Sequence, residues 1–145
     1  LIDTDVSLRK DVSAVFPPTP FDVAFADRHW PHLPQGDQVL QTMPFNTGVC
    51  FSRNPCFWQA VLEVWLGYPH DQRDWMSEQR AVYDVVRSGR FLVTILPGMI
   101  YNYPPNDQSD PCADAALVHY KGPQRKTWLT ARAYDRYREP VQVSA

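Results

Sequence analysis

Proline places the strongest limit on how this chain can fold, because 14 of its 145 residues are proline. Each proline removes a backbone hydrogen-bond donor and disrupts the interior of a helix or a central strand. The prolines gather in segments 16–20 and 103–106, and two more fall in an irregular stretch over 27–42. We therefore predict short helices and strands joined by long loops.

Helix and strand signals remain between the prolines. Asn54 is a favourable N-cap and Pro55 suits the first helical position, so a helix is predicted from residue 55 to 66. A second helix is predicted over 77–86, with Ser77 as its N-cap. Strands are predicted over 21–26, 91–96 and 115–120, and a terminal helix or tail over 126–138. The pattern favours an α/β fold, and no repeat or linker divides it into more than one domain.

Asp3 and Asp5 flank Thr4 directly after the apolar Leu1-Ile2 pair. Carboxylates two residues apart point the same way in an extended chain, so this spacing suits a strand end or a turn. The pair has two interpretations. It caps the backbone of a solvated turn, or it binds a hard divalent cation.

His119 ends the last predicted strand, far from the acidic pair in sequence. A histidine on an apolar strand is commonly a hydrogen-bonded core residue. Its imidazole is also a ligand that Mn²⁺ accepts beside carboxylates. If Asp3, Asp5 and His119 meet in space, they form a metal site.

Three segments taken together resemble a known family. They are the acidic triplet after an apolar strand, the run Phe45-Asn46-Thr47-Gly48-Val49, and the run from His119 through Gly122 to Trp128. Their order is similar to that of the nucleotide-diphospho-sugar glycosyltransferases of GT-A type, in particular the glycogenin-like and bacterial galactosyltransferase-like enzymes. The resemblance spans residues 1–129. It implies a partial GT-A-like mixed sheet with flanking helices and long proline-rich loops.

The resemblance implies a metal site. In such enzymes the acidic triplet, known as the DxD motif, and the late histidine hold Mn²⁺ or Mg²⁺. The metal bridges the two phosphates of the donor. Carried over, Asp3, Asp5 and His119 become the metal ligands. The metal would offset the negative charge that forms on the leaving nucleoside diphosphate.

The resemblance also implies that Gly122 and a nearby cation contact the diphosphate, with Lys121 as a further cation. The family pattern places this cation six residues after the histidine, where Arg125 stands. Lys126 and Trp128 each lie one residue later than the pattern expects. Arg125 and Lys126 therefore both stay open for this role, and the alternative for either is a solvated surface charge.

For the sugar, the resemblance points to two further places. Glu78 and Gln79 open a predicted helix where the family has an acidic-Gln pair that faces the donor sugar, which makes them candidate catalytic residues. Their alternative is a plain helix start, in which Glu78 complements the helix dipole. By the same resemblance Asn46, Thr47 and Gly48 contact the sugar or the acceptor. Their alternative is an ordinary turn.

Composition narrows the class of protein. The formal charge is −2 and the basic residues are scattered, so we expect no positively charged surface that would bind nucleic acid. No run of eighteen apolar residues suggests a membrane span, and the acidic start does not resemble a secretory signal, so we expect a cytoplasmic protein. Three cysteines, at positions 50, 56 and 112, match neither a disulfide framework nor a zinc motif.

Members of the family place a nucleotide-binding half before the acidic triplet, and this half does not precede the triplet here. We therefore expect residues 1–145 to be one domain, the metal and acceptor side of a glycosyltransferase-like fold. Such a domain would bind its donor weakly, or would complete its sheet by self-association or with a partner chain.

Three functions remain in view. The leading one is metal-dependent transfer of a sugar from a nucleotide-diphospho-sugar donor to the hydroxyl of a glycan or another acceptor. A second is a non-catalytic remnant that binds sugars or other proteins. A third is a metal-dependent phosphohydrolase, which would need further carboxylates near the site, and Asp22 and Asp27 are the nearest candidates.

Overall fold

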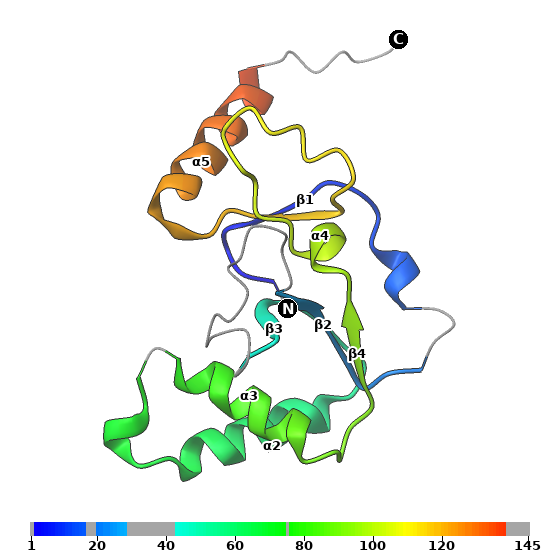
Figure 1. Ribbon diagram of the computed structural model, residues 1–145, viewed down its shortest axis with the longest axis vertical. Helices are drawn as coiled ribbons and strands as arrows, with labels where there is room; N and C mark the ends of the chain where they lie inside the picture. The colour runs from blue at the N-terminus through cyan, green and yellow to red at the C-terminus, as the bar shows by residue number, and fades with distance from the viewer. Residues whose placement is uncertain (1, 17–19, 29–42, 75, 139–145) are drawn as a thin grey trace.

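The computed structural model describes residues 2–16, 20–28, 43–74 and 76–138. In Figure 1 a central group of strands lies between two helices at one end of the molecule and a long helix at the other. The strands are β1 (Val6–Leu8), β2 (Val23–Asp27), β3 (Phe45–Ser52), β4 (Val93–Leu96) and β5 (Leu117–His119). The α-helices are α2 (Pro55–Gly67), α3 (Ser77–Arg87), α4 (Gly98–Tyr101) and α5 (Gly122–Arg138).

The main sheet has three strands in the order β3-β2-β4. Its central strand, β2, pairs antiparallel with β3 and parallel with β4, so the sheet is mixed. Four of the five β2 residues are buried, as expected for an apolar strand covered on both faces. The expected α/β class with a mixed sheet and flanking helices is confirmed.

A separate two-stranded ribbon joins the first and the last strand of the described chain. β1 pairs antiparallel with β5, with Val6 opposite His119. The ribbon is tied to the main sheet by an isolated bridge between Ile2 and Val49 of β3. This arrangement brings residues from the start of the chain beside those of the last strand.

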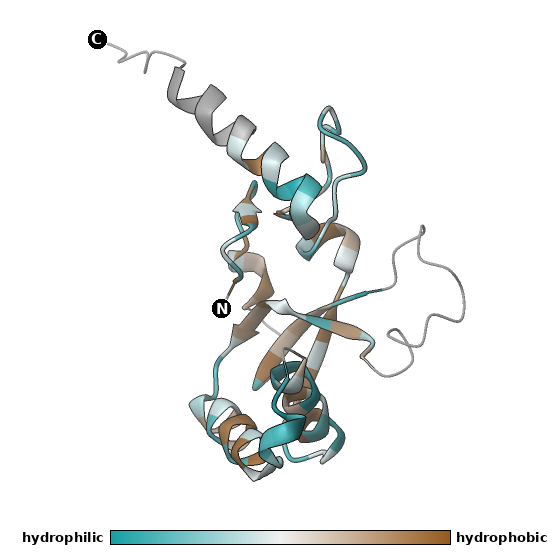
Figure 2. Ribbon diagram, turned by 90° about the vertical axis from the view of Figure 1, so that its left-hand side faces the viewer, coloured by the Kyte–Doolittle hydropathy of each residue, from teal (hydrophilic) through white to brown (hydrophobic). Residues whose placement is uncertain are grey.

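The α2 and α3 helices cover one face of the main sheet. Their buried residues pack with the strand residues Val23, Phe25 and Phe45 in one apolar cluster. Figure 2 shows brown strands beside helices of mixed colour, as expected for helices with one face on a core. Among the described residues, no helix has both the length and the apolar content that a membrane crossing requires.

The local signals held in most places. Asn54 caps α2, because its side-chain oxygen accepts a hydrogen bond from the backbone of Cys56 at 3.0 Å. The expectation that Ser77 caps α3 was wrong. Ser77 is the first residue of the helix, and its hydroxyl donates back to the carbonyl of Asp74. The Asp74 carboxylate instead accepts from the backbone of Met76, just before the helix begins.

Two further boundaries differ from expectation. The regular strand β1 follows the acidic pair rather than preceding it, so Asp3 and Asp5 lie in the turn that leads into the ribbon. The last helix begins at Gly122, four residues before the expected start. The irregular stretch expected over 27–42 lies mostly outside the described residues.

Candidate metal centre and adjoining pocket

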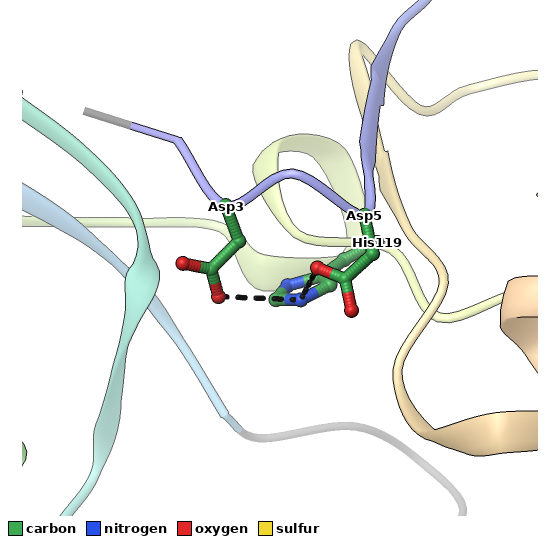
Figure 3. A group of neighbouring side chains, drawn as sticks. All are labelled: Asp3, Asp5 and His119. Carbon is green, nitrogen blue, oxygen red and sulfur yellow. Dashed lines mark ion pairs between the residues drawn. The ribbon is translucent and has the colours of Figure 1, made fainter.

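Asp3, Asp5 and His119 meet at the edge of the ribbon (Figure 3). The Nε2 atom of His119 lies 3.1 Å from a carboxylate oxygen of Asp5 and 3.7 Å from one of Asp3. One ligand atom from each of the three residues lies within 4.8 Å of the other two. Among the described residues, these three side chains form a set of histidine and acidic groups that could share a metal ion.

Backbone hydrogen bonds hold the acidic turn in place on both sides. The N–H of Asp3 donates to the carbonyl of Gly48, and the N–H of Tyr120 donates to the carbonyl of Asp5. Because Val6 is opposite His119 in the ribbon, Asp5 lies one residue from the imidazole across the strand pair. The long-range meeting thus follows from strand register.

The irregular part of β3 reaches the same place. The β2–β3 register shifts so that Phe25 faces Cys50 whereas its neighbour Ala26 faces Asn46, which leaves residues 47–49 as a bulge. Gly48 lies in this bulge. A Cβ atom at Gly48 would lie 2.4 Å from a carboxylate oxygen of Asp3 and 2.6 Å from the His119 ring, closer than atoms can pack. The centre therefore requires glycine here.

The His119 side chain is buried, and its surroundings favour the neutral ring. Burial lowers its pKa to about 4, the nearby positive charge of Lys121 adds to this shift, and Asp5 opposes it. The Nδ1 atom lies 2.8 Å from Oδ1 of Asn102, an oxygen that can only accept, so Nδ1 carries the hydrogen. Nε2 then carries no hydrogen, and its lone pair faces the Asp5 carboxylate.

This geometry fits a cation. With the ring neutral, the 3.1 Å contact between Nε2 of His119 and the Asp5 carboxylate brings two hydrogen-bond acceptors together with no hydrogen between them. A divalent cation bound by both would remove that repulsion. Two carboxylates and one imidazole also form a ligand set that suits Mn²⁺.

A pocket of about 400 Å³ opens beside the acidic turn. Asp3 lines this pocket together with all three residues that were expected to contact the sugar or acceptor. One of the two candidate catalytic residues, Gln79, lines it as well. Its lining residues are Asp3, Arg28, Asn46, Thr47, Gly48, Met76, Gln79 and Lys121. Within the pocket wall, the Asn46 side-chain oxygen accepts from the Gly48 N–H at 2.6 Å, as expected for a turn.

Two cations line this pocket. Arg28 is largely buried and donates to the Gln79 side-chain oxygen. The pKa of Lys121 is lowered to about 7, first by burial and then by the positive charge of Arg28. A group that carries negative charge would therefore face the Arg28 guanidinium and a lysine whose protonated form that negative charge would favour.

The two basic residues that were left open as diphosphate binders, Lys126 and Arg125, lie in different places. Lys126, near the start of α5, lies 3.2 Å from a carboxylate oxygen of Asp5, at the centre itself. Arg125 turns away, and its guanidinium donates to the carbonyl of Pro105 in the proline-rich loop. Gly122 has a φ of 82°, a conformation that glycine adopts readily, with open space around its Cα.

Glu78 lies apart from the pocket that holds Gln79. It lines a different groove, between α2 and α3, together with Trp58 and Trp65. In the first turn of α3, Gln79 therefore faces the pocket beside the acidic turn, whereas Glu78 faces the groove between α2 and α3. Asn102 and Arg28 join the site although the sequence analysis did not select them. Their role depends on tertiary placement, and neither belongs to a motif with a recognisable spacing.

Comparison with known proteins gives one informative match. No protein-family model matches the sequence, and no curated protein gives a significant match. A solved structure, the crystal structure of a glycosyltransferase involved in the glycosylation of the major capsid of PBCV-1, matches with a TM-score of 0.64 at 18% identity. The chain has a glycosyltransferase fold. The match covers 89% of this chain and 64% of that one, so the chain spans less than two thirds of the matched structure's length.

The glycosyltransferase resemblance drawn from the motifs is thus confirmed at the level of the fold. The GT-A subtype and the roles of individual site residues stay predictions.

Proposed function

We propose that this chain is the metal and acceptor side of a glycosyltransferase that moves a sugar from a nucleotide-diphospho-sugar to an acceptor hydroxyl. One observation carries the proposal. Asp3 and Asp5 lie near the start of the chain and His119 lies more than a hundred residues later, and yet one ligand atom from each lies within 4.8 Å of the other two. A pocket lined by the residues expected to bind a sugar adjoins them. The shared fold supports this reading.

Asp3, Asp5 and His119 would hold Mn²⁺ or Mg²⁺. Bound there, the metal would supply Lewis acidity against the negative charge that forms on the leaving nucleoside diphosphate. Lys126 would bind the diphosphate, because it lies beside Asp5. Arg125 is the weaker choice, since its guanidinium is engaged by the proline-rich loop.

The pocket residues would orient the sugar. Asn46 uses its oxygen within the turn, which leaves its amide nitrogen for a sugar hydroxyl. Gln79 lines the same pocket and is a better candidate than Glu78 for a contact with the sugar. Lys121 and Gly122 would contact the diphosphate of the donor, because the exposed Gly122 has no side chain and leaves room for a close approach.

The phosphohydrolase alternative has less support. It needs further carboxylates at the centre, and the nearest candidates are engaged elsewhere. Asp22 accepts from the backbone of Leu92 and from the Asn54 side chain. Asp27 accepts from the backbone of Gly98 at 3.0 Å. Neither belongs to the group of ligand atoms around His119 among the described residues.

The test combines metal binding with donor turnover. Calorimetry should show Mn²⁺ binding to the wild-type chain, and a panel of nucleotide-diphospho-sugars should include one from which Mn²⁺-dependent release of nucleoside diphosphate occurs. His119→Ala should lose both signals while its circular dichroism stays unchanged. The matched control is His70→Ala, which removes an exposed histidine from a short turn away from the centre.

Two results would redirect the proposal. If the wild-type chain releases no nucleotide from any donor and no nucleotide raises its melting temperature with Mn²⁺, the result supports the non-catalytic remnant. If it instead releases phosphate from simple phosphoesters with Mn²⁺, it is a phosphohydrolase.

A further inference from the structure

Asn102 is a fully buried polar residue directly after α4. Its Oδ1 faces Nδ1 of His119 at 2.8 Å, while no described residue accepts a hydrogen bond from its Nδ2. A buried amide N–H without an acceptor lowers stability. A residue with this cost is therefore better explained by its contact with His119 than by a contribution to folding.

The backbone around Asn102 is held firmly against the histidine strand. The N–H of Asn102 donates to the carbonyl of Gly98 at 2.8 Å, which closes the turn of α4. On the next residue, Tyr103 both accepts from the N–H of His119 at 2.8 Å and donates to the carbonyl of Leu117 at 3.0 Å. The side chain of Asn102 thus approaches His119 from a segment that is hydrogen-bonded to the same strand.

We propose that Asn102 is a positioning residue that fixes the hydrogen of His119 on Nδ1 and so keeps the Nε2 lone pair directed at Asp3 and Asp5. The inference rests on the proposed metal site. Without the Asn102 oxygen, the ring gains by moving its hydrogen to Nε2, where the Asp5 oxygen accepts it from 3.1 Å. That hydrogen would occupy the atom that must bind the metal.

The first test reads the tautomer in metal-free protein. ¹⁵N-histidine NMR distinguishes the two neutral forms, and His119→Gln identifies the signal of His119 among the four histidines. We expect the hydrogen on Nδ1 in the wild type and on Nε2 in Asn102→Leu, which has a similar size and no acceptor. Asn102→Asp supplies an acceptor oxygen at the same place and should keep the wild-type form.

The second test measures Mn²⁺ affinity by calorimetry. Asn102→Leu should weaken binding by about 10- to 100-fold, the usual effect of losing a group that supports a metal ligand. Asn102→Asp should bind at least as tightly as the wild type. The matched control is Asn106→Leu, an exposed asparagine on the same loop whose side chain contacts Tyr103 rather than His119, and it should change neither measurement.

Each failure has its own meaning. Hydrogen on Nε2 in the metal-free wild type overturns the inference, and this result requires no variant to fold. It is also overturned if Asn102→Leu keeps both tautomer and affinity, or if Asn102→Asp loses them as fully as Asn102→Leu does. If the wild type binds no Mn²⁺, the proposed function fails, while the tautomer measurements still decide the role of Asn102.

Discussion

At the scale of single residues, the centre depends on a missing side chain as much as on those present. Gly48 lies where Asp3, His119 and Asn46 converge, and a methyl group there would overlap all three. We expect Gly48→Ala to displace the acidic turn, to weaken Mn²⁺ binding, and to lower the free energy of unfolding by about 1–3 kcal/mol through overpacking. Calorimetry and urea unfolding measure the two effects.

Gly67 provides the comparison for Gly48. It ends α2, and a Cβ atom there would meet nothing within 4 Å. Gly67→Ala should leave Mn²⁺ binding unchanged and should not destabilise the chain. Equal behaviour of the two alanine variants would contradict the packing described around Gly48.

Part of this centre was predictable from residue types alone. The acidic pair and His119 were selected because carboxylates and imidazole suit a divalent cation, and the structure brings them together. Asn102 was not selected, because its contact with His119 depends on the pairing of the α4 segment with β5. Arg28 was missed for a similar reason, since one arginine after a strand gives no sign of the pocket that it lines.

At the scale of elements, local capping signals were predictable where one residue had no competitor. Asn54 before Pro55 caps α2 as expected. At α3 the Asp74 carboxylate accepts from Met76, so the cap lies earlier in the chain and Ser77 enters the helix. The bulge of β3 was not predictable, because an alternating apolar pattern gives no sign of a register shift between paired strands.

The cap of α2 is testable by itself. Asn54 accepts from the Cys56 backbone and donates to the Asp22 carboxylate at 2.8 Å, so it both begins the helix and ties it to the residue before β2. We expect Asn54→Ala to lower the free energy of unfolding by about 1–2 kcal/mol. Asn54→Ser restores the cap alone and should recover part of that loss in chemical unfolding. An alanine variant as stable as the wild type would show that the cap contributes nothing.

At the scale of the whole molecule, the buried imidazole makes global stability depend on pH. The pKa of His119 falls from an ordinary 6.5 to about 4 on folding, chiefly through burial. The unfolded chain therefore binds the proton more readily between these values. In metal-free protein, stability from this group is complete above about pH 6.5 and declines as the pH falls toward 4. The loss is on the order of 3 kcal/mol.

Urea unfolding at pH 7 and pH 4 in the presence of a chelator measures this effect. His119→Gln cannot take up the proton, so it should lose less stability between the two pH values than the wild type does. A wild type and variant that lose the same amount would mean that His119 does not hold its neutral form in the folded chain.

The ribbon of β1 and β5 gives the proposed metal a second consequence. An ion shared by Asp5 and His119 would cross-link β1 to β5 and close a loop that contains the main sheet and the α2 and α3 helices but not α5. Such a closure removes conformational entropy from the unfolded chain, and the gain grows slowly with loop length. Withdrawal of the ion would then loosen the short ribbon before the three-stranded sheet, which keeps its own apolar cluster. The metal would therefore stabilise the pairing of β1 with β5 in addition to its proposed role in catalysis.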